Sequence, residues 1–371
     1  MNVHDSVMER YSEGAQARQP ALCCPIDYDA NLLEILPQEI VDKDYGCGDP
    51  SRYVRTGDVV LDLGSGGGKI AYMAAQLVGE QGRVIGVDMN DDMLALARKY
   101  QTEMAAKLGG ERVRFLKGHI QDLALSIEAV DAYLAEHPVR TSAEHAAFLD
   151  WQAQQRAQSP LIADAVVDLV ISNCVLNLVH DADKAQLVRE IFRVLKPGGR
   201  VAISDIVSDE VVPEHLKRDA QLWSGCISGA FQEEEFLRAF VDAGFVAVAY
   251  DKWDAQPWQV VEGIEFRSVT LTAVKPEAAA CLDYGHAVIY RGPHAEVRDE
   301  EGHIFPRGAR IAVCERTYRL LTSGAYGEDF IGLPPAVRGE PACFCAPHGT
   351  RRPAAAAKGS AHGGGSVKGC C

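Results

Sequence analysis

The chain has 371 residues, 47% of them hydrophobic and 24% charged, a composition typical of a globular protein large enough for two domains. Its net charge of −15 repels phosphate groups, so we expect no nucleic-acid partner and no binding to an anionic membrane surface. No run of 18 apolar residues occurs and the first twenty residues lack an apolar core, so we expect neither a transmembrane helix nor a secretory signal.

Strand and helix patterns alternate over most of the chain. This alternation predicts an α/β fold, a mostly parallel Rossmann-like sheet with helices on both faces. Apolar runs predict buried strands within 58–68, 82–90, 113–120, 165–173 and 200–208, and later over 246–253 and 266–275. Helical spacing of apolar residues predicts helices over 69–79, 91–109, 181–199 and 231–245.

Several stretches depart from this alternation and suggest the domain organisation. The segment 122–160 is rich in Ala, Glu and Gln and is predicted to be a helical insertion within a core domain at 57–275. An N-terminal segment, 1–56, contains cysteines. Residues 280–335 alternate short β-like runs with glycine and proline turns, which predicts a small β-rich domain. Residues 336–371 end in an Ala/Gly-rich stretch and are predicted to be a flexible tail with cysteines.

The segment LDLGSGGGKI places a glycine-rich turn directly after the first predicted strand. Its Gly64, Gly66 and Gly68 allow a sharp turn and let a ligand approach the backbone. Asp62 lies just before them, and Asp88 closes the second strand, where a carboxylate can accept hydrogen bonds from a ribose diol. The spacing differs from the Gly-x-Gly-x-x-Gly of dinucleotide sites, and the absence of Gly-Lys-Ser/Thr excludes a nucleotide-hydrolysing P-loop.

This turn and its acidic partner resemble motif I and the following acid of class I S-adenosylmethionine-dependent methyltransferases. The resemblance implies that the glycine loop packs against the methionine part of the cofactor and that Asp88 binds the ribose hydroxyls. It also implies that Ile120, after the third strand, lies at the adenine ring. Met89 and Asn173 complete the predicted S-adenosylmethionine site.

Eleven cysteines are spread through the chain, an odd number that does not suit a small, disulfide-stapled secreted protein. We therefore predict a reducing, cytoplasmic location. In such a compartment several cysteines indicate either binding of a soft metal or metalloid, or thiol chemistry. Each of them can also serve simply as a small hydrophobic residue in a core.

Two of these cysteines occur where a parallel sheet presents functional side chains, and a third, Cys47 in DYGCGDP, lies in a loop just before the first predicted strand. Cys174, in SNCVLN, follows the fourth predicted strand, and Cys226, in WSGCISGA, follows the fifth. Because the carboxyl ends of parallel strands meet at one edge, these two thiols can converge there, and Cys47 can fold over the same mouth. Three thiolates make a soft ligand set, and without a Cys-x-x-Cys or His-x-Cys pair a four-coordinate zinc site is disfavoured.

These neighbourhoods resemble the arsenite S-adenosylmethionine methyltransferases. The matching segments are DYGCGDP, VLDLGSGGGK, GVDMNDDML, ISNCVLNL, REIFRVLKPGG, ISDIV and GCISGA. The resemblance implies that Cys174 and Cys226 bind trivalent arsenic. It further implies that Cys47 and an N-terminal cysteine, either Cys23 or Cys24, cycle through a disulfide or serve as additional ligands.

The resemblance covers about residues 20–275 and predicts methylation of arsenite, either free or as its glutathione complex, in arsenic detoxification. No general base is needed, because the lone pair of thiol-bound arsenic attacks the methyl group in line. Positioning of this kind contributes about 7–11 kcal/mol. Since methylation formally oxidises arsenic, protein thiols can return electrons by forming a disulfide, which thioredoxin or glutathione would then reduce.

The residues alone leave two other functions open. One is a small-molecule O-, N- or C-methyltransferase with structural cysteines, in which Asn173 and Asn177 position the acceptor. The other is a metalloid-sequestering protein without turnover, against which the intact glycine turn and Asp88 argue. Cys281 and Cys314 are expected to be ordinary domain cysteines. The tail cysteines that either capture arsenic or belong to a dispensable extension are Cys343, Cys345, Cys370 and Cys371.

Overall fold

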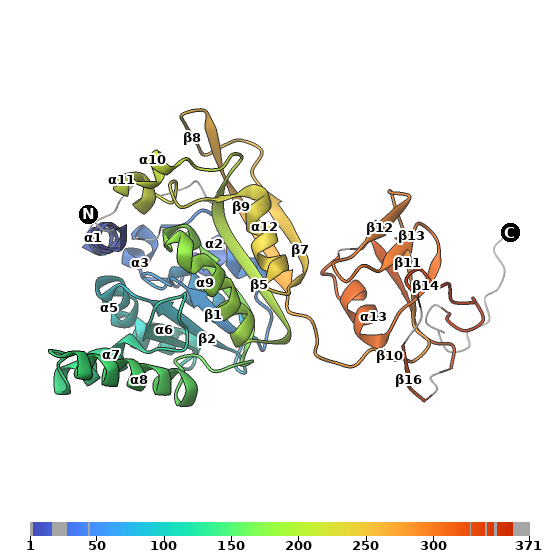
Figure 1. The fold of residues 1–371 in the computed structure, drawn as a ribbon, viewed down its shortest axis with the longest axis horizontal. Coiled ribbons are helices and arrows are strands. Elements are labelled where there is room, and N and C mark those ends of the chain that lie inside the picture. The colour runs from blue at the N-terminus through green and yellow to red at the C-terminus, as the bar shows by residue number, and fades with distance from the viewer. Residues whose placement is uncertain are drawn as a thin grey trace. The chain divides into compact units, whose positions relative to one another are not determined.

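The computed structural model describes residues 3–16, 28–43, 45–326, 328–337, 340–344 and 347–358. The chain forms two compact units, Met1–Lys275 and Pro276–Cys371 (Figure 1). Among the described residues, no helix has both the length and the apolar character needed to cross a membrane.

A nine-stranded sheet forms the centre of the first unit. Its main path runs β3-β2-β1-β4-β5-β9-β7, with parallel pairing from β3 to β5 and antiparallel pairing where β9 joins β5 and β7. This architecture confirms the predicted α/β class. The strands are β1 (Val59–Leu63), β2 (Arg83–Asp88), β3 (Val113–Lys117), β4 (Val167–Asn173), β5 (Leu195–Ser208), β6 (Phe231–Gln232), β7 (Val246–Trp253), β8 (Gln259–Val261) and β9 (Ile264–Val274).

Helices cover both faces of this sheet, and each face has its own apolar core (Figure 1). One core joins α9 and α12 to the sheet through fully buried side chains such as Ile191 and Phe236. The other core joins α4, α5 and α6 to the opposite face, with Met73 and Leu94 fully buried. The bounds of these helices are α4 (Lys69–Leu77), α5 (Asp91–Lys99), α6 (Gln101–Leu108), α9 (Asp181–Val194) and α12 (Glu233–Asp242).

Further helices lie outside these layers. The helix α1 (Val3–Gln16), which the sequence analysis did not predict, packs against α5 and α11 (Figure 1). Within 122–160 lie α7 and α8, where the rings of Tyr133 and Trp151 stack with centroids 4.3 Å apart. The remaining bounds are α2 (Ala30–Leu33), α3 (Gln38–Asp42), η2 (Pro50–Tyr53), α7 (Ile127–Glu136), α8 (Ser142–Gln158), η3 (Leu176–Leu178), α10 (Glu214–Lys217) and α11 (Ala220–Ser224).

Two predicted helices differ from the structure. The segment 91–109 forms two consecutive helices, α5 and α6, rather than one. The helix predicted over 181–199 ends before Leu195, which already pairs with Val167 as the first residue of β5. Because Pro197 lacks an N–H donor and disfavours helical backbone at the residue before it, the chain leaves the helix at this point.

The second unit is rich in β-strand, as predicted, with a three-stranded sheet in the order β14-β11-β15 and two-stranded ribbons β10-β16 and β12-β13. Its core includes Tyr290, Phe305 and Leu321. Helix α13 lies in a region predicted as strands, because eight residues are too few for helical periodicity to stand out. The elements are β10 (Leu282–Asp283), β11 (Ala287–Tyr290), β12 (Glu296–Arg298), β13 (Ile304–Pro306), β14 (Arg310–Ala312), α13 (Glu315–Thr322), β15 (Phe330–Leu333) and β16 (Ala342–Cys343).

Candidate active site

A cavity of about 340 Å³ opens at the carboxyl ends of the parallel strands in the first unit. It is bordered by the glycine turn after β1, the residues that follow β2, β3 and β4, and one side of α1. Crevices at this edge of doubly wound sheets are the usual place for a ligand. The predicted cofactor residues that line it are Asp62, Gly64, Gly66, Asp88, Met89, Ile120 and Asn173.

The glycine turn brings the backbone close to this cavity. Gly64 has a φ of 67°, and a Cβ there would lie 2.4 Å from Cγ1 of Val175, so a larger residue would clash. Gly66 has a φ of 50°, and nothing lies within 4 Å of a Cβ built on it, because this residue faces open space. Gly68 has a φ of 88° and is the N-cap residue of α4. At Gly66 the turn therefore exposes backbone, rather than a side chain, to a ligand.

Asp88 presents a carboxylate to the same cavity from the end of β2. Its Oδ2 accepts the N–H of Gly66 at 2.8 Å and its Oδ1 accepts the N–H of Asn90 at 2.8 Å. Burial raises the pKa of Asp88, and these N–H donors oppose that rise. Each oxygen keeps a further lone pair, so the carboxylate can still accept hydrogen bonds from a diol. Together with apolar Ile120, this lining fits S-adenosylmethionine.

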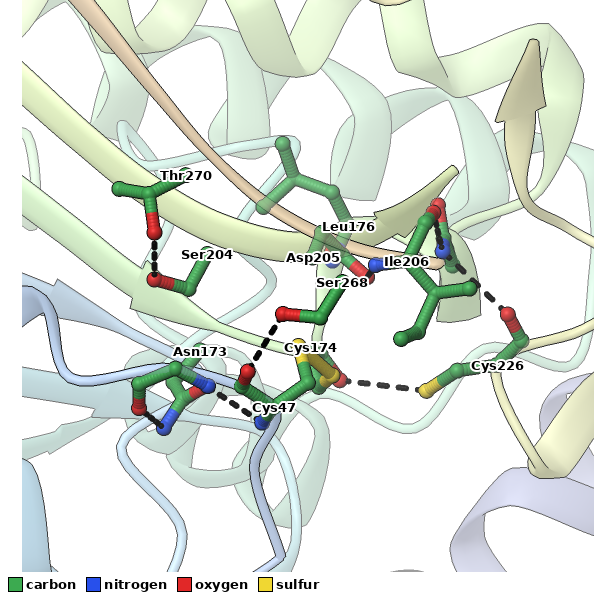
Figure 2. Close-up of a disulfide and its surroundings, with 12 residues drawn as sticks. Cys47, Asn173, Cys174, Leu176, Ser204, Asp205, Ile206, Cys226, Ser268 and Thr270 are labelled. Atoms are coloured by element: carbon green, nitrogen blue, oxygen red, sulfur yellow. Dashed lines mark hydrogen bonds between the residues drawn. A yellow bond between two sulfur atoms is a disulfide. The ribbon is translucent and has the colours of Figure 1, made fainter. Parts of the chain in front are cut away.

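Cys47 and Cys174 form a disulfide beside this cavity, with Cα atoms 5.8 Å apart (Figure 2). Cys174 follows β4 directly and lines the cavity, whereas Cys47 belongs to the loop before η2. Both thiols were expected at the same edge of the sheet, with Cys47 and an N-terminal cysteine either cycling through a disulfide or serving as additional ligands. In this structure the partner of Cys47 is Cys174 instead. Cys23 and Cys24 lie outside the described residues.

Cys226 completes the group of cysteines from the segment after α11 (Figure 2). Its Sγ donates to the carbonyl oxygen of Cys174 at 3.3 Å, so the third thiol contacts the backbone of a disulfide residue. Asn177 helps to hold this arrangement, because its Nδ2 donates to the carbonyls of Ile206 at 2.6 Å and Cys226 at 3.3 Å. All three cysteines are buried in one apolar cluster.

Cys174 and Cys226 both have a positive φ, of 58° and 64° respectively. An L-residue in this left-handed region costs about 1–2 kcal/mol relative to ordinary helical backbone. Such strain persists only where the surrounding structure fixes it, and it is concentrated at functional sites.

Asn173 lines the cavity, but its amide group binds the loop that carries Cys47 (Figure 2). Its Oδ1 accepts the N–H groups of Cys47 at 2.9 Å and Gly48 at 3.0 Å, and its Nδ2 donates to the carbonyl of Gly48 at 2.8 Å. Ser268 of β9 donates to the carbonyl of Cys47 at 2.6 Å. Asn173 therefore positions a cysteine, which its place at the end of β4 did not reveal.

Asp205 is a site residue that the sequence analysis missed. One of its carboxylate oxygens and the sulfurs of Cys47 and Cys174 all lie within 4.8 Å of one another. The carboxylate accepts the N–H groups of Leu176 at 2.9 Å and Ile206 at 2.8 Å. Burial raises the pKa of Asp205 to about 6 despite these donors. The clue to Asp205 in the sequence is that it is the single acidic residue in the apolar run of β5.

Helix α1 also contributes residues that the sequence analysis missed. Val7, Met8 and Tyr11 line the cavity. The Tyr11 hydroxyl forms a side-chain hydrogen bond with Cys226, and burial together with this thiol raises the pKa of Tyr11. The polar sequence of α1 gave no sign of these contacts, which depend on its packing against α5 and α11.

Comparisons with known proteins agree with this geometry. Residues 55–244 match a family described as "Methyltransferase domain", and residues 277–362 match a domain family of unknown function. The arsenite methyltransferase of Aquipseudomonas alcaligenes is 32% identical over 88% of this chain and 90% of its own length. That of Mus musculus is 28% identical over 83% of this chain and 75% of its own.

A solved structure is similar over both units. It is the crystal structure of an arsenic(III) S-adenosylmethionine methyltransferase from Chlamydomonas reinhardtii, which is 28% identical to this chain. The similarity covers 87% of this chain and 99% of that one, with a TM-score of 0.56.

Proposed function

Since the chain belongs to the arsenite methyltransferase family, we propose that it methylates trivalent arsenic held by the thiolates of Cys47, Cys174 and Cys226. The observation that carries this proposal is that Cys174 lines the glycine-turn cavity while its sulfur is bonded to Cys47 and its backbone carbonyl accepts the Cys226 thiol. Soft sulfur ligands select a thiophilic substrate, whereas an oxygen or nitrogen acceptor would need no such group.

The cofactor residues support a site for the methyl donor next to the thiols. The glycine turn would hold the methionine part, Asp88 the ribose hydroxyls and Ile120 the adenine. S-adenosylmethionine, when bound, supplies an electrophilic methyl group. Because Cys174 lines the same cavity as Gly66, a substrate on its sulfur borders the place where the donor binds.

The thiols must be reduced before arsenic binds, because Cys47 and Cys174 are joined in the disulfide. A dithiol reductant such as thioredoxin, or two molecules of glutathione, would supply two electrons and two protons and would itself be oxidised to a disulfide. Each cysteine sulfur then replaces one oxygen ligand of arsenite, and the thiol protons leave as water. This requirement for reduction supports the cytoplasm as the compartment.

Methyl transfer then needs no general base. The arsenic lone pair forms the arsenic–carbon bond while the carbon–sulfur bond of the donor breaks, and arsenic is formally oxidised by two electrons. Cys47 and Cys174 would return two electrons by re-forming their disulfide; the methylated arsenic, trivalent again, would keep the sulfur of Cys226 and take a hydroxide from water, whose proton is released. The buried cysteines exclude water, and Asn173 and Ser268 hold the Cys47 loop so that the reacting atoms stay aligned.

Serine variants test the thiol ligands. We expect Cys174→Ser and Cys226→Ser each to abolish methylation of arsenite in a reduced assay, because serine oxygen is a poor ligand for trivalent arsenic. Affinity for S-adenosylmethionine, measured by calorimetry, should not change. Cys343→Ser, an exposed cysteine of the second unit, is the control and should keep full activity. Arsenite turnover by either active-site variant would refute the proposal.

Substitution of the carboxylate tests the separate cofactor site. Asp88→Asn should weaken S-adenosylmethionine binding by roughly 10- to 100-fold, because a charged hydrogen-bonding group contributes about 1.5–3 kcal/mol. Arsenite affinity should stay unchanged; it can be followed by the fluorescence of Trp223, whose carbonyl accepts the N–H of Cys226 at 3.0 Å. Equal weakening of both ligands would contradict two separate sites.

A further inference from the structure

Lys184 is a buried cation in the helix α9, only 7% exposed. Its Nζ donates to the carbonyl of Gly229 at 2.6 Å and lies 4.4 Å from the centre of the Phe231 ring. Asp181, the first residue of α9, forms an ion pair with this ammonium at 2.6 Å. Burying a charge is costly unless it is paired and hydrogen-bonded, so these contacts are what allow a lysine here.

The carbonyl that Lys184 binds belongs to the loop 225–230, called here the Cys226 loop, which joins α11 to β6. Neutral side-chain hydrogen bonds also hold this loop. Asn177 donates to the carbonyl of Cys226 at 3.3 Å, and the hydroxyl of Ser228 donates to a carbonyl of α10 at 2.6 Å. Of these three hydrogen bonds only the one from Lys184 has a charged donor, and such bonds are roughly twice as strong as neutral ones.

The Cys226 loop packs closely on the segment that follows Cys174. A Cβ built on Gly229 would lie 2.0 Å from the carbonyl oxygen of Asn177, in η3, so the two backbones leave no room for a side chain. In the same loop, the sulfur of Cys226 donates to the carbonyl of Cys174 at 3.3 Å (Figure 2). Lys184 therefore holds the loop where its backbone lies directly against the segment after Cys174.

A further ion pair fixes Asp181. Its Oδ2 accepts from Lys217 of α10 at 2.7 Å, while its Oδ1 pairs with Lys184. Because α10 also accepts the hydroxyl proton of Ser228, this network connects both helices that hold the Cys226 loop. The first turn of α9 borders the cofactor cavity through Asp183, so the loop is tied to an element of the cavity wall.

We propose that Lys184 is a positioning residue for Cys226, whose loop its ammonium holds so that the third sulfur stays beside Cys174. The consequence for arsenic rests on the proposed function, in which Cys226 is a ligand. The consequence for the loop does not, because the contacts belong to the chain without substrate. Without the ammonium, the buried carbonyl of Gly229 loses its donor, and the loop opens to solvent more often.

Alkylation of Cys226 in the disulfide form tests this role directly. The oxidised full chain is treated briefly with iodoacetamide, and mass spectrometry of the peptide that contains Cys226 gives its rate of alkylation. Lys184→Met removes the ammonium but keeps a long apolar side chain. It should raise the rate by about 10- to 100-fold, because a buried carbonyl loses a charged donor. An unchanged rate would overturn the proposal.

Lys275→Met is the matched control. Lys275 also donates to backbone carbonyls, those of Phe192 at 2.7 Å and Leu195 at 2.8 Å, and its Nζ lies 4.6 Å from the centre of the Phe192 ring. This variant should lose stability in urea yet keep the original rate of Cys226 alkylation. An equal rise in the Lys275 and Lys184 variants would show that Lys184 only stabilises the unit, and would overturn the proposal.

Gly229→Ala breaks the same contact from the side of the loop, because its Cβ would clash with the carbonyl oxygen of Asn177. Cys226 should again be alkylated faster, and a rate equal to that of the original chain would count against the proposal even if Lys184→Met failed to fold.

Arsenite binding to the reduced chain separates this proposal from the proposed function. Followed by Trp223 fluorescence, arsenite affinity should fall about tenfold or more in Lys184→Met, while S-adenosylmethionine affinity stays unchanged. If the original chain binds arsenite as tightly as Cys226→Ser, the proposed function fails, and the alkylation rates still decide the role of Lys184. If Cys226 does contribute, an unchanged arsenite affinity in Lys184→Met overturns the positioning role.

Discussion

At the residue scale, Cys174 and Cys226 combine a reactive side chain with a backbone conformation that suits glycine. A positive φ is costly for any residue with a Cβ, and Ala165 and Ala247 adopt one as well, so the sulfur is what distinguishes these two positions. The two strained residues flank the same hydrogen bond, from Sγ of Cys226 to the carbonyl of Cys174. The left-handed backbone at both residues therefore accompanies this hydrogen bond.

The strain at Cys226 can be measured by comparing two substitutions. Cys226→Gly should be about 1 kcal/mol more stable than Cys226→Ala, because only the alanine keeps the cost of a positive φ. Urea unfolding followed by tryptophan fluorescence gives the difference. Ala230 is buried in the same cluster without a positive φ, so Ala230→Gly should instead lower stability. A Cys226→Ala variant as stable as Cys226→Gly would contradict this account.

Asp205 predicts a dependence of stability on pH. Its pKa is about 6 in the folded protein, against an ordinary value of 3.8, so folding favours the protonated form. This contribution is fully present below about pH 4 and is lost as the pH rises through about 6. The size of the loss is about 3 kcal/mol, since one pKa unit corresponds to about 1.36 kcal/mol.

The variant Asp205→Asn stays neutral at every pH. Its free energy of unfolding, relative to the original chain, should therefore rise by about 3 kcal/mol between about pH 4 and pH 7. Urea unfolding of the disulfide form measures this, because Cys47 and Cys174 do not titrate there. A difference in stability that is constant with pH would show that Asp205 is not destabilised as a carboxylate.

At the element scale, Asn90 links the cofactor side of the sheet to α1. Its Oδ1 caps α5 by accepting the N–H groups of Asp92 and Met93, both at 3.0 Å. Its Nδ2 donates to the carbonyl of Met8 at 3.2 Å and to Ser12 at 3.1 Å, both in α1. The side chain of Asn90 thus binds α1, which borders the cavity, and also caps α5, which follows Asp88.

Asn90→Asp separates these two functions. Aspartate keeps the N-cap of α5 but has no donor for Met8, so α1 should be held less firmly. We expect amide exchange in α1 to become about tenfold faster, which corresponds to the loss of about one net hydrogen bond. Exchange in α5 should not change, whereas Asn90→Ala should accelerate both helices. Unchanged protection of α1 in Asn90→Asp would contradict the assigned link.

The sequence contains the local parts of this fold but not the contacts between them. The apolar strands, the glycine turn and the position of Asp88 are local patterns, and each predicted strand of the first unit recurs in the structure within a few residues. The helix α1 and the short α13 depend on tertiary packing, which no periodicity of their own reveals. In the site, the hydrogen bond from the N–H of Cys47 to Oδ1 of Asn173 joins residues 126 positions apart, so no sequence pattern pairs them.

At the scale of the whole molecule, the cofactor cavity belongs to one unit. Every residue that lines it lies between Val7 and Asp183, within Met1–Lys275. The second unit has its own apolar core around Tyr290 and Phe305. Each unit therefore has the packing it needs to fold by itself.

A chain that ends at Lys275 tests this separation. We expect it to fold and to bind S-adenosylmethionine with the affinity of the full chain, as measured by calorimetry. Circular dichroism should show a cooperative thermal transition. Loss of binding in a folded, truncated chain would mean that Pro276–Cys371 contributes to the cofactor site.

The central claim is that three converging thiolates hold the arsenic beside the methyl donor. X-ray absorption at the arsenic edge measures this directly, on a reduced chain that keeps only Cys47, Cys174 and Cys226, with every other cysteine replaced by serine. With one equivalent of arsenite, three sulfur neighbours are predicted, and two after Cys226→Ser. An arsenic atom surrounded by oxygen, or unaffected by the loss of Cys226, would contradict the claim.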